Sequence, residues 1–325
     1  MFLLHTKQHY DTKMDQIFLE QLNMGPFHTL PQDVTGGDKR VRTVYQHTTK
    51  LLRRLQPKAV IVYGDTISAT AAGMATKGLG LELIHVEAGL RCGDLSLPEE
   101  VGRILIDGMA DVLMAPTDLQ KDNLSSEGTD EGVFVTGNSI ADSVAWGLKQ
   151  LENGATGFKA PDKYVLFSAH RVENVDDPLR FGRMMQYLTA LQKAIGLPVV
   201  WPVHPRVWAR QKLVPSKDLQ LVDPMGFLEF LDAERKASLV LTDSGGVQEE
   251  TMLLGVPCAT LRRSTERPET VECGANIIVD IAKVEEEQFV SEIMRHYQGP
   301  RDWKNPYGTN VAAKIVDVLE NEGFL

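Results

Sequence analysis

The stretch over residues 239–267, LVLTDSGGVQEETMLLGVPCATLRRSTER, constrains the fold of this chain more than any other stretch. Residues 239–241 are apolar, are too few for a helix and are followed by polar residues, so they predict a buried strand. The small residues at 244–246 predict a tight turn, and the apolar spacing from Val247 predicts a helix that stops at Gly255. The stretch therefore predicts a strand, a turn and a helix in direct succession.

Such a unit favours an anion, most often a phosphate, because the helix start offers free backbone N–H groups and the positive end of the helix dipole. Gly245 and Gly246 let the backbone approach a diphosphate closely, and Ser244 adds a hydroxyl donor. Glu249 or Glu250 is expected to accept hydrogen bonds from the hydroxyl groups of a ribose, as acidic residues do in dinucleotide folds. The alternative is that both carboxylates only complement the helix N-terminus.

Apolar runs alternate with helical patterns along the whole chain. In the first half, strands are predicted at residues 2–5, 59–63, 81–86, 112–115 and 133–136, and helices at about 14–22, 39–55 and 99–108. In the second half, strands are predicted at 164–168, 198–201, 219–222, 239–242, 258–261 and 276–279, and a last helix at about 308–321. Nearly continuous apolar strands that alternate with helices predict an α/β fold with parallel sheets covered on both faces.

A change of composition divides the chain. Residues 153–163 are rich in Gly, Ala and Pro, and the alternation of strand and helix restarts after them. We therefore expect two domains, residues 1–152 and 153–325, and the length of 325 residues is sufficient for both. The loop before the last helix is long enough for that helix to leave the second domain.

Charge and cysteine content exclude several classes of protein. The formal charge is −10, from 34 basic and 44 acidic side chains, so a nucleic-acid partner is not expected. No run approaches the ~20 apolar residues of a membrane span, and the apolar start is too short for a signal peptide. Cys92, Cys258 and Cys273 are odd in number and lack metal-ligand spacing, which predicts reduced thiols and a cytoplasmic location.

Carboxylates follow the predicted strands of the first half. Asp65 comes after the strand at 59–63, Glu87 after the strand at 81–86, and Glu99 on the next loop. Ligands of open parallel sheets bind beyond these strand ends, where burial and mutual repulsion raise carboxyl pKa values into the range useful for proton transfer. Singly, Asp65 is also compatible with a helix N-cap and Glu99 with dipole compensation. Three carboxylates at successive strand ends favour one shared cleft.

Histidine and arginine follow the strands of the second half. His170 and Arg171 come after the strand at 164–168, and His204 comes after the strand at 198–201. His170 is compatible with a buried core histidine, but its place beside Arg171 at a strand end favours a donor or acid that faces a ligand. His204 is a weaker candidate for substrate binding. No metal site and no Ser-His-Asp order is indicated.

Taken together, these segments resemble the non-hydrolysing UDP-N-acetylglucosamine 2-epimerases. The matching segments are QHYDTKMDQIF (8–18), GDT (64–66), HVEAGLR (85–91), PEE (98–100), APT (115–117), TGN (136–138), AHRVEN (169–174), PVHPR (202–206), TDSGGVQEE (242–250), STERPE (264–269) and NPYG (305–308). They follow the order of the family and cover nearly the whole chain. The resemblance implies two Rossmann-like domains that face each other across a cleft, as in glycosyltransferases of the B type, with the last helix on the first domain. It also implies a homodimer.

The resemblance implies a role for each candidate residue. The acid/base set is Asp65, Glu87, Glu99 and His170; the diphosphate contacts are Arg171, Ser244, Gly245, Gly246 and Arg267; Glu250 contacts the ribose and Phe230 lies near the uracil. The reaction implied is removal of the C2 proton with loss of UDP from C1, which gives a 2-acetamidoglucal, followed by return of the proton to the other face and of UDP to C1. The ligand implied is the UDP-sugar substrate, without metal or nicotinamide, and no nucleic-acid or membrane partner is expected.

Related activities are also compatible with these residues. They are a hydrolysing 2-epimerase that releases N-acetylmannosamine and an epimerase of a related UDP-diacetamido sugar. A glycosyltransferase is less favoured, because it does not need so many carboxylates opposite the nucleotide.

The chain differs from the family pattern in three places. Family members begin with a strand and a Gly-Thr-Arg-Pro-Glu turn ahead of the segment that matches Gln8, so we expect the native start to lie upstream of Met1. Without that strand, which is central in a doubly wound sheet, the alternative is a UDP-sugar binder with little turnover. Gly102 and Gly108 replace the usual Asn and His, and glycine inside a helix costs about 1 kcal/mol relative to alanine.

Overall fold

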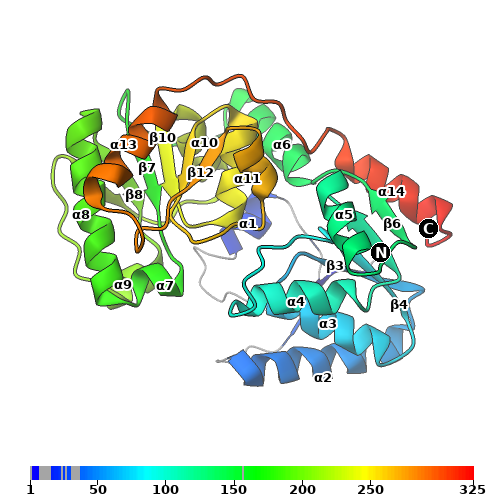
Figure 1. Ribbon diagram of the computed structural model, residues 1–325. Helices are drawn as coiled ribbons and strands as arrows, with labels where there is room; N and C mark the ends of the chain where they lie inside the picture. The colour runs from blue at the N-terminus through cyan, green and yellow to red at the C-terminus, as the bar shows by residue number, and fades with distance from the viewer. Residues whose placement is uncertain (1, 7–15, 23–24, 26–27, 31–36, 156) are drawn as a thin grey trace. The chain divides into compact units, whose positions relative to one another are not determined.

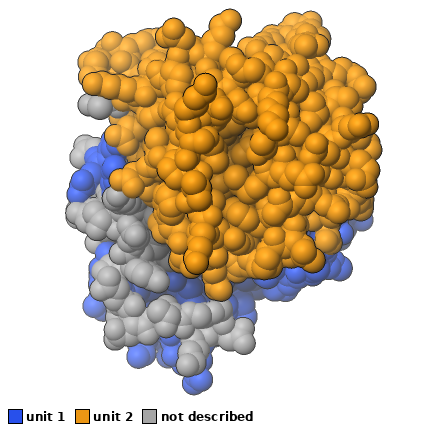
Figure 2. Space-filling view, turned by 90° about the vertical axis from the view of Figure 1, so that its left-hand side faces the viewer, with its two compact units in different colours: residues 1–142, 306–325 blue, residues 143–305 orange. Residues whose placement is uncertain are grey.

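The computed structural model describes all residues except 1, 7–15, 23–24, 26–27, 31–36 and 156 (Figure 1). The chain divides into two compact units, whose residues are coloured separately in Figure 2. Unit 1 consists of residues 1–142 and 306–325, and unit 2 consists of residues 143–305. The boundary predicted from composition lies at residue 153, whereas the boundary between the two units lies at residue 143. These two positions are near the two ends of one helix, α6 (Ile140–Glu152).

The described part of unit 1 holds two parallel sheets. β1 (Leu4–His5) pairs with β2 (His28–Thr29), and a four-stranded sheet has the order β3-β4-β5-β6. Its strands are β3 (Ala59–Tyr63), β4 (Glu82–Val86), β5 (Val112–Ala115) and β6 (Val133–Val135). The helices are α1 (Gln16–Gln21), α2 (Gly37–Leu55), α3 (Ile67–Lys77), α4 (Pro98–Asp107), α5 (Asp118–Ser126) and α14 (Val311–Asn321). The start of the helix predicted at 14–22 and most of the 8–18 segment lie outside the described residues.

Both faces of the inner strands β4 and β5 are covered, because their neighbouring residues are mostly apolar and point in opposite directions. Leu83 of β4 packs in a cluster with Ile106 of α4. The next residue, Ile84, packs in another cluster with Leu319 of α14. The last helix of the chain therefore completes the core of unit 1 (Figure 1).

The two unexpected glycines of α4 have different roles. Gly102 lies inside the helix, where an added Cβ would lie 2.9 Å from the hydroxyl oxygen of Thr70, so its small size permits close packing on α3. Gly108 follows the last helical residue as the C-cap. The expected cost of a glycine inside a helix therefore does not apply at position 108.

Unit 2 contains one six-stranded parallel sheet with the order β12-β11-β10-β7-β8-β9 in its described residues. The strands are β7 (Val165–Ser168), β8 (Val199–Pro202), β9 (Leu219–Val222), β10 (Leu239–Thr242), β11 (Cys258–Thr260) and β12 (Asn276–Ile278). The helices are α7 (Val172–Val175), α8 (Pro178–Ile195), α9 (Pro205–Arg210), α10 (Phe227–Lys236), α11 (Gly245–Leu254), α12 (Pro268–Glu272) and α13 (Glu286–Tyr297). The predicted α/β class with two parallel-sheet domains is confirmed.

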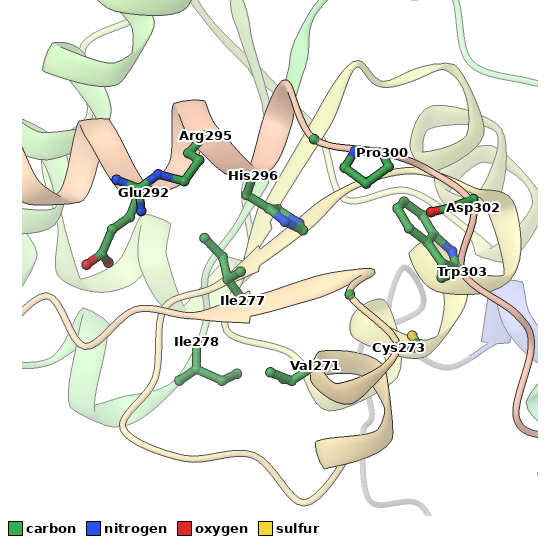
Figure 3. A pocket seen from close by; sticks show the side chains of 12 residues that line it. Val271, Cys273, Ile277, Ile278, Glu292, Arg295, His296, Pro300, Asp302 and Trp303 are labelled. Carbon is green, nitrogen blue, oxygen red and sulfur yellow. The ribbon is translucent and has the colours of Figure 1, made fainter.

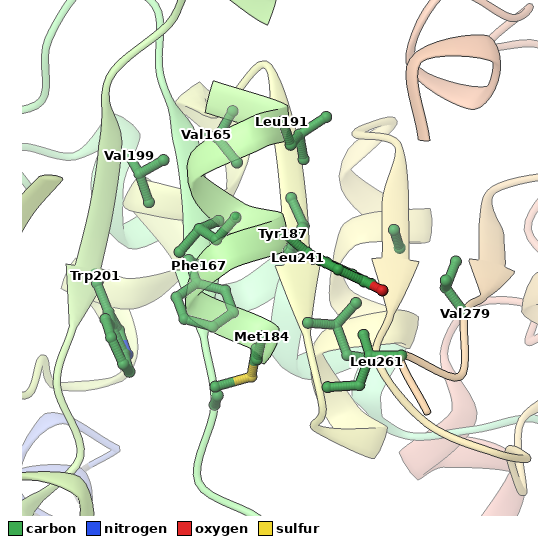
Figure 4. Close-up of a cluster of buried hydrophobic side chains, with 14 of the residues drawn as sticks. Val165, Phe167, Met184, Tyr187, Leu191, Val199, Trp201, Leu241, Leu261 and Val279 are labelled. Carbon is green, nitrogen blue, oxygen red and sulfur yellow. The ribbon is translucent and has the colours of Figure 1, made fainter. Parts of the chain in front are cut away.

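The core of unit 2 has two layers, one on each face of the sheet. On one face, Phe167 and Trp201 pack with their ring centroids 4.7 Å apart, beneath Leu191 and other residues of α8 and α13 (Figure 4). On the other face, Leu166 and Val240 pack against α10 and α11. The apolar residues of unit 2 thus pack on the two faces of its sheet. Among the described helices of the chain, none is apolar over a length that could cross a membrane.

Candidate functional site

The predicted strand, turn and helix are present as β10, the turn at 243–246 and α11 (Figure 1). Ser244 is the N-cap of α11, but its hydroxyl group makes no capping hydrogen bond. A Cβ at position 245 would lie 2.4 Å from Oε1 of Glu266, so a larger residue there would displace the Glu266 side chain. Because the first N–H groups of a helix have no partner within it, the turn can bind an anion through its backbone.

Asp243 connects this turn to the loop after β7. Its side chain is fully buried, and its carboxylate accepts hydrogen bonds from the backbone N–H groups of His170 (3.1 Å) and Arg171 (3.0 Å). The Asn174 amide donates a third hydrogen bond at 3.0 Å, and Nε of Arg171 donates to the backbone carbonyl of Asp243 at 2.9 Å. The two predicted ligand-facing segments of unit 2 therefore lie together. Asp243 was missed as a site residue, although it stands inside the TDSGG segment.

The two candidate histidines also lie together. The rings of His170 and His204 are stacked with their centroids 5.5 Å apart. Nδ1 of His170 is 3.3 Å from a carboxylate oxygen of Asp243, and 43% of the His170 side chain is exposed. Nδ1 of His204 accepts a hydrogen bond from the backbone N–H of Arg206, so the proton of the neutral His204 ring is on Nε2. The two histidines thus form one stacked pair, and neither of them is fully buried.

The structure distinguishes the two neighbouring glutamates of α11. Glu249 is buried and forms an ion pair with Arg267, with 2.9 Å between Oε1 and Nε. Glu250 is only half-buried. Of the two carboxylates that the sequence left open for a ribose, Glu250 is therefore the one with an accessible side. Arg267 is a buried residue at the start of α12.

The inner side of Glu250 lies against α10. The carboxyl group of Glu234 is fully buried and interacts with that of Glu250, although neither of its oxygens makes a hydrogen bond of normal geometry in the described structure. Burial raises the pKa of Glu234 well above its usual range, and the charge of Glu250 raises it further. Burial raises the pKa of Glu250 to about 7, although the interaction with Glu234 acts in the opposite direction. Phe230, on the same helix as Glu234, is partly buried against the apolar cluster beneath α10.

In unit 1, Asp65 and Glu87 follow strands that pair directly. Tyr63 at the end of β3 is in register with Val86 at the end of β4, so both carboxylates stand at the same edge of the sheet. Asp65 is not the N-cap of α3, because Thr66 accepts the hydrogen bond from the first turn at 3.1 Å. Glu99 is exposed in the first turn of α4.

A buried ion-pair network holds Asp65 in place. Arg103 donates to Asp65 through Nη1 and to Glu100 through Nη2, the latter at 2.7 Å. Glu100 also accepts from the backbone N–H groups of Cys92 and Gly93, at 2.9 and 2.8 Å. Burial alone would raise the pKa of Glu100, but the hydrogen bonds from Arg103 and Gly93 outweigh it and hold the pKa below its usual range. The PEE segment thus supplies one exposed and one buried carboxylate, a difference that the sequence does not reveal.

Glu87 has a strained backbone. Its φ of +70° lies in the left-handed region, which costs a non-glycine residue about 1–2 kcal/mol. Gly64 opposite also has a positive φ of +65°, and a Cβ there would lie 3.3 Å from Oε2 of Glu87. Such strain is commonly found at functional sites.

A separate hollow of about 730 Å³ lies at the edge strand β12 of unit 2 (Figure 3). The side chains of Arg295, His296 and Trp303 line it together with Ile277. None of the candidate site residues lines this hollow. It is therefore distinct from the turn at 243–246.

Comparison with known proteins gives consistent matches over nearly the whole chain. The model of the UDP-N-acetylglucosamine 2-epimerase family matches residues 1–320. A UDP-N-acetylglucosamine 2-epimerase of Methanocaldococcus jannaschii is 38% identical over 98% of this chain and 90% of its own length. A UDP-2,3-diacetamido-2,3-dideoxy-D-glucuronate 2-epimerase of Pseudomonas aeruginosa is 37% identical over 86% of this chain and 80% of its own length.

A solved structure agrees with the sequence comparison. The crystal structure of the M. jannaschii UDP-GlcNAc 2-epimerase in complex with UDP-GlcNAc and UDP has a TM-score of 0.91 and 36% identity. The match covers 99% of this chain and 92% of that one. The parallel-sheet units, the TDSGG turn and the strand-end carboxylates occur in a chain that matches this family from end to end, and the protein belongs to the UDP-N-acetylglucosamine 2-epimerase family.

Proposed function

We propose that this protein reversibly converts UDP-N-acetylglucosamine to UDP-N-acetylmannosamine by inversion at C2. The observation that carries the proposal is the match, along nearly its whole length, to an epimerase whose crystal structure holds UDP-GlcNAc and UDP. The local geometry of each unit supports it independently. Unit 2 offers an anion-binding turn, and unit 1 offers carboxylates at paired strand ends.

Unit 2 is proposed to bind the nucleotide. The backbone N–H groups at the start of α11 and the Ser244 hydroxyl would donate to the diphosphate, with the Arg171 guanidinium beside them. Glu250 would accept from the ribose, and Phe230 would lie near the uracil. As UDP leaves C1, negative charge grows on the diphosphate, so donors fixed by Asp243 would stabilise the departing group.

Unit 1 is proposed to move the proton. One base among Asp65, Glu87 and Glu99 would take the proton from C2 while the C1–O bond to UDP breaks, which leaves a C1=C2 double bond in 2-acetamidoglucal. An acid, either another of these three carboxyl groups or His170 of unit 2, would return a proton to the opposite face of C2 as UDP re-forms the C1–O bond. Every bond broken in the first half is formed again in the second, so no co-reactant is required.

Deuterium exchange tests this mechanism directly. The full chain should be incubated with UDP-N-acetylglucosamine in deuterated water, and both recovered sugar nucleotides should carry deuterium at C2. Glu87→Gln should reduce exchange by about 100-fold or more, as expected for loss of a general acid or base. Conversion without deuterium at C2 would rule out the elimination mechanism, and absence of conversion would rule out the activity.

Nucleotide binding is tested by a paired substitution in unit 2. Ser244→Ala with Glu250→Ala should weaken UDP binding about 10- to 1,000-fold, because charge-assisted hydrogen bonds are lost. Ser291→Ala with Glu287→Ala on the exposed side of α13 is the matched control and should bind as the parent chain does. Equal UDP affinity in both double variants, measured by calorimetry, would refute the assignment.

A second substrate deserves the same assay because of the P. aeruginosa relative, which is named for a UDP-diacetamido glucuronate. Both nucleotide sugars should be supplied to the same preparation and their kcat/KM values compared. We expect the N-acetylglucosamine nucleotide to be preferred. A higher kcat/KM for the uronate would reassign the substrate while retaining C2 epimerisation.

The resemblance also leads us to propose a homodimer in the cytoplasm. Analytical ultracentrifugation of the purified chain should give twice the chain mass of 36.1 kDa. Fractionation of cells that express the chain should place it in the cytoplasm, and a mass of one chain or an extracellular location would contradict these expectations.

A further inference from the structure

The carboxylate of Glu87 has defined partners on two other elements of unit 1. Its Oε1 accepts a hydrogen bond from Nδ2 of Asn138 at 3.2 Å, and the Tyr63 hydroxyl is a second, longer donor at 3.4 Å. The Tyr63 hydroxyl also lies 2.8 Å from the hydroxyl oxygen of Ser139. Three segments, the end of β3, the end of β4 and the start of α6, therefore meet at one carboxylate.

The orientation of the Asn138 amide is fixed by its surroundings. The residue is 1% exposed, and its Oδ1 accepts a hydrogen bond from the backbone N–H of Ile140 at 3.0 Å. With Oδ1 held by the first turn of α6, Nδ2 is the atom that faces Glu87. The amide therefore donates its hydrogen bond to Oε1 of Glu87 from a fixed position.

The segment around Tyr307 packs against Gly137, the residue that precedes Asn138. Gly137 has a φ of +96°, and a Cβ on it would lie 2.3 Å from the backbone carbonyl oxygen of Tyr307. Tyr307 itself is fully buried. The TGN and NPYG segments, which are far apart in the sequence, thus pack directly on each other. The position of Asn138 is therefore set in part by a segment from near the other end of the chain.

We propose that Asn138 is a positioning residue that holds the Glu87 carboxylate, through Oε1, in the orientation from which it exchanges the proton with the substrate. The opposite residue, Gly64, has no side chain, and a Cβ there would lie 3.3 Å from Oε2 of Glu87 and press on the carboxylate. The segment through Tyr307 maintains this arrangement by fixing Gly137. This inference rests on the proposed acid/base role of Glu87.

The test is a pH profile of kcat for C2 exchange in variants of the full chain. Asn138→Ala should lower kcat about 10- to 100-fold with KM changed less than about threefold, because a displaced base loses its alignment with C2. The acidic limb of the profile should move to higher pH by about half to one unit, since the carboxylate has lost a donor. Asn138→Asp should move it further, because a like charge then faces Glu87.

Two further variants separate positioning from folding. Asn123→Ala removes another amide donor to the same loop, the 2.9 Å hydrogen bond to the carbonyl oxygen of Gly89, and is the matched control. It should leave the acidic limb in place even if it lowers stability. Tyr63→Phe changes a side chain that is 48% exposed, so it should fold, and it should shift the limb in the same direction but less.

The outcomes are separable from those of the proposed function. Absence of C2 exchange in the parent chain would refute the epimerase assignment and this inference with it. Exchange in the parent chain with an unmoved acidic limb in Asn138→Ala and Asn138→Asp would refute the positioning role alone. An equal shift in Asn123→Ala would show that the loop, rather than the amide at Asn138, sets the behaviour of Glu87.

Discussion

Replacing Glu234 with glutamine should make the free energy of unfolding less dependent on pH between about 4.5 and 7. In the folded protein, burial raises the pKa of Glu250 from 4.5 to about 7 and raises that of Glu234 well above 4.5. Between the unfolded and folded values the folded state holds more protons than the unfolded state. The free energy of unfolding therefore falls as pH rises through this window.

The size of the effect follows from the same values. A carboxyl pKa raised from 4.5 to about 7 corresponds, at ~1.4 kcal/mol for each pH unit, to a loss of about 3 kcal/mol across the window. Glu234→Gln removes one of the two titrating groups, whereas the burial that raises the pKa of Glu250 remains. The variant should therefore lose about this amount over the interval, from Glu250 alone, and the parent chain should lose more because Glu234 contributes as well.

Urea unfolding of the full chain at several pH values from 5 to 8 measures this slope. Glu287→Gln, an exposed substitution on α13, is the matched control and should follow the parent slope. UDP titrations over the same range give a second readout, because Glu250 is the proposed ribose acceptor. A Glu234→Gln slope equal to that of the parent would show that the two carboxyl groups do not titrate as a buried pair, and the reasoning would be wrong.

Asp243→Asn should lower the free energy of unfolding by about 2–4 kcal/mol and weaken UDP binding, because an amide N–H₂ group would face the N–H donors that now bind the carboxylate; urea unfolding and calorimetry measure both. Gly137→Ala should destabilise unit 1 by more than Gly128→Ala, since both glycines have positive φ but only the first would place a methyl group 2.3 Å from a backbone oxygen. Leu191→Ala, at a position 1% exposed, should cost about 2–5 kcal/mol, whereas Leu179→Ala on the same helix, 86% exposed, should change stability by less than about 0.5 kcal/mol. Equal losses within either pair would contradict the burial that the structure assigns.

The strands were predictable because burial on both faces leaves a continuous apolar run in the sequence. The predicted bounds of β3 and β5 agree with the structure, since polar residues or turns flank each run. Where the bounds differ, the backbone gives the reason. The last helix begins at Val311 instead of residue 308, because Gly308 and Asn310 have φ values of +74° and +53°, which no α-helix accepts.

The site was predictable only to the level of the strand ends. Parallel strands place Asp65 and Glu87 at one edge whatever their later contacts are. The choice between Glu249 and Glu250 depends on Arg267, which arrives from a different loop. The contact between Asn138 and Glu87 likewise joins residues 51 positions apart. Contacts of this kind leave no local pattern, since they depend on the packing of distant elements.

Unit 1 is formed by two separate segments of the chain, residues 1–142 and 306–325, and this limits the order in which a nascent chain can fold. Lys58 donates a hydrogen bond to the carbonyl oxygen of Gly323, 265 positions later, and Leu319 completes the cluster around Ile84. At about 5–20 residues per second, the ribosome adds these last residues on the order of ten seconds or more after residue 142. Unit 2 is one continuous segment, so it can finish folding before α14 has been synthesised and has covered the sheet face around Ile84. The unit that is synthesised first is therefore the one completed last.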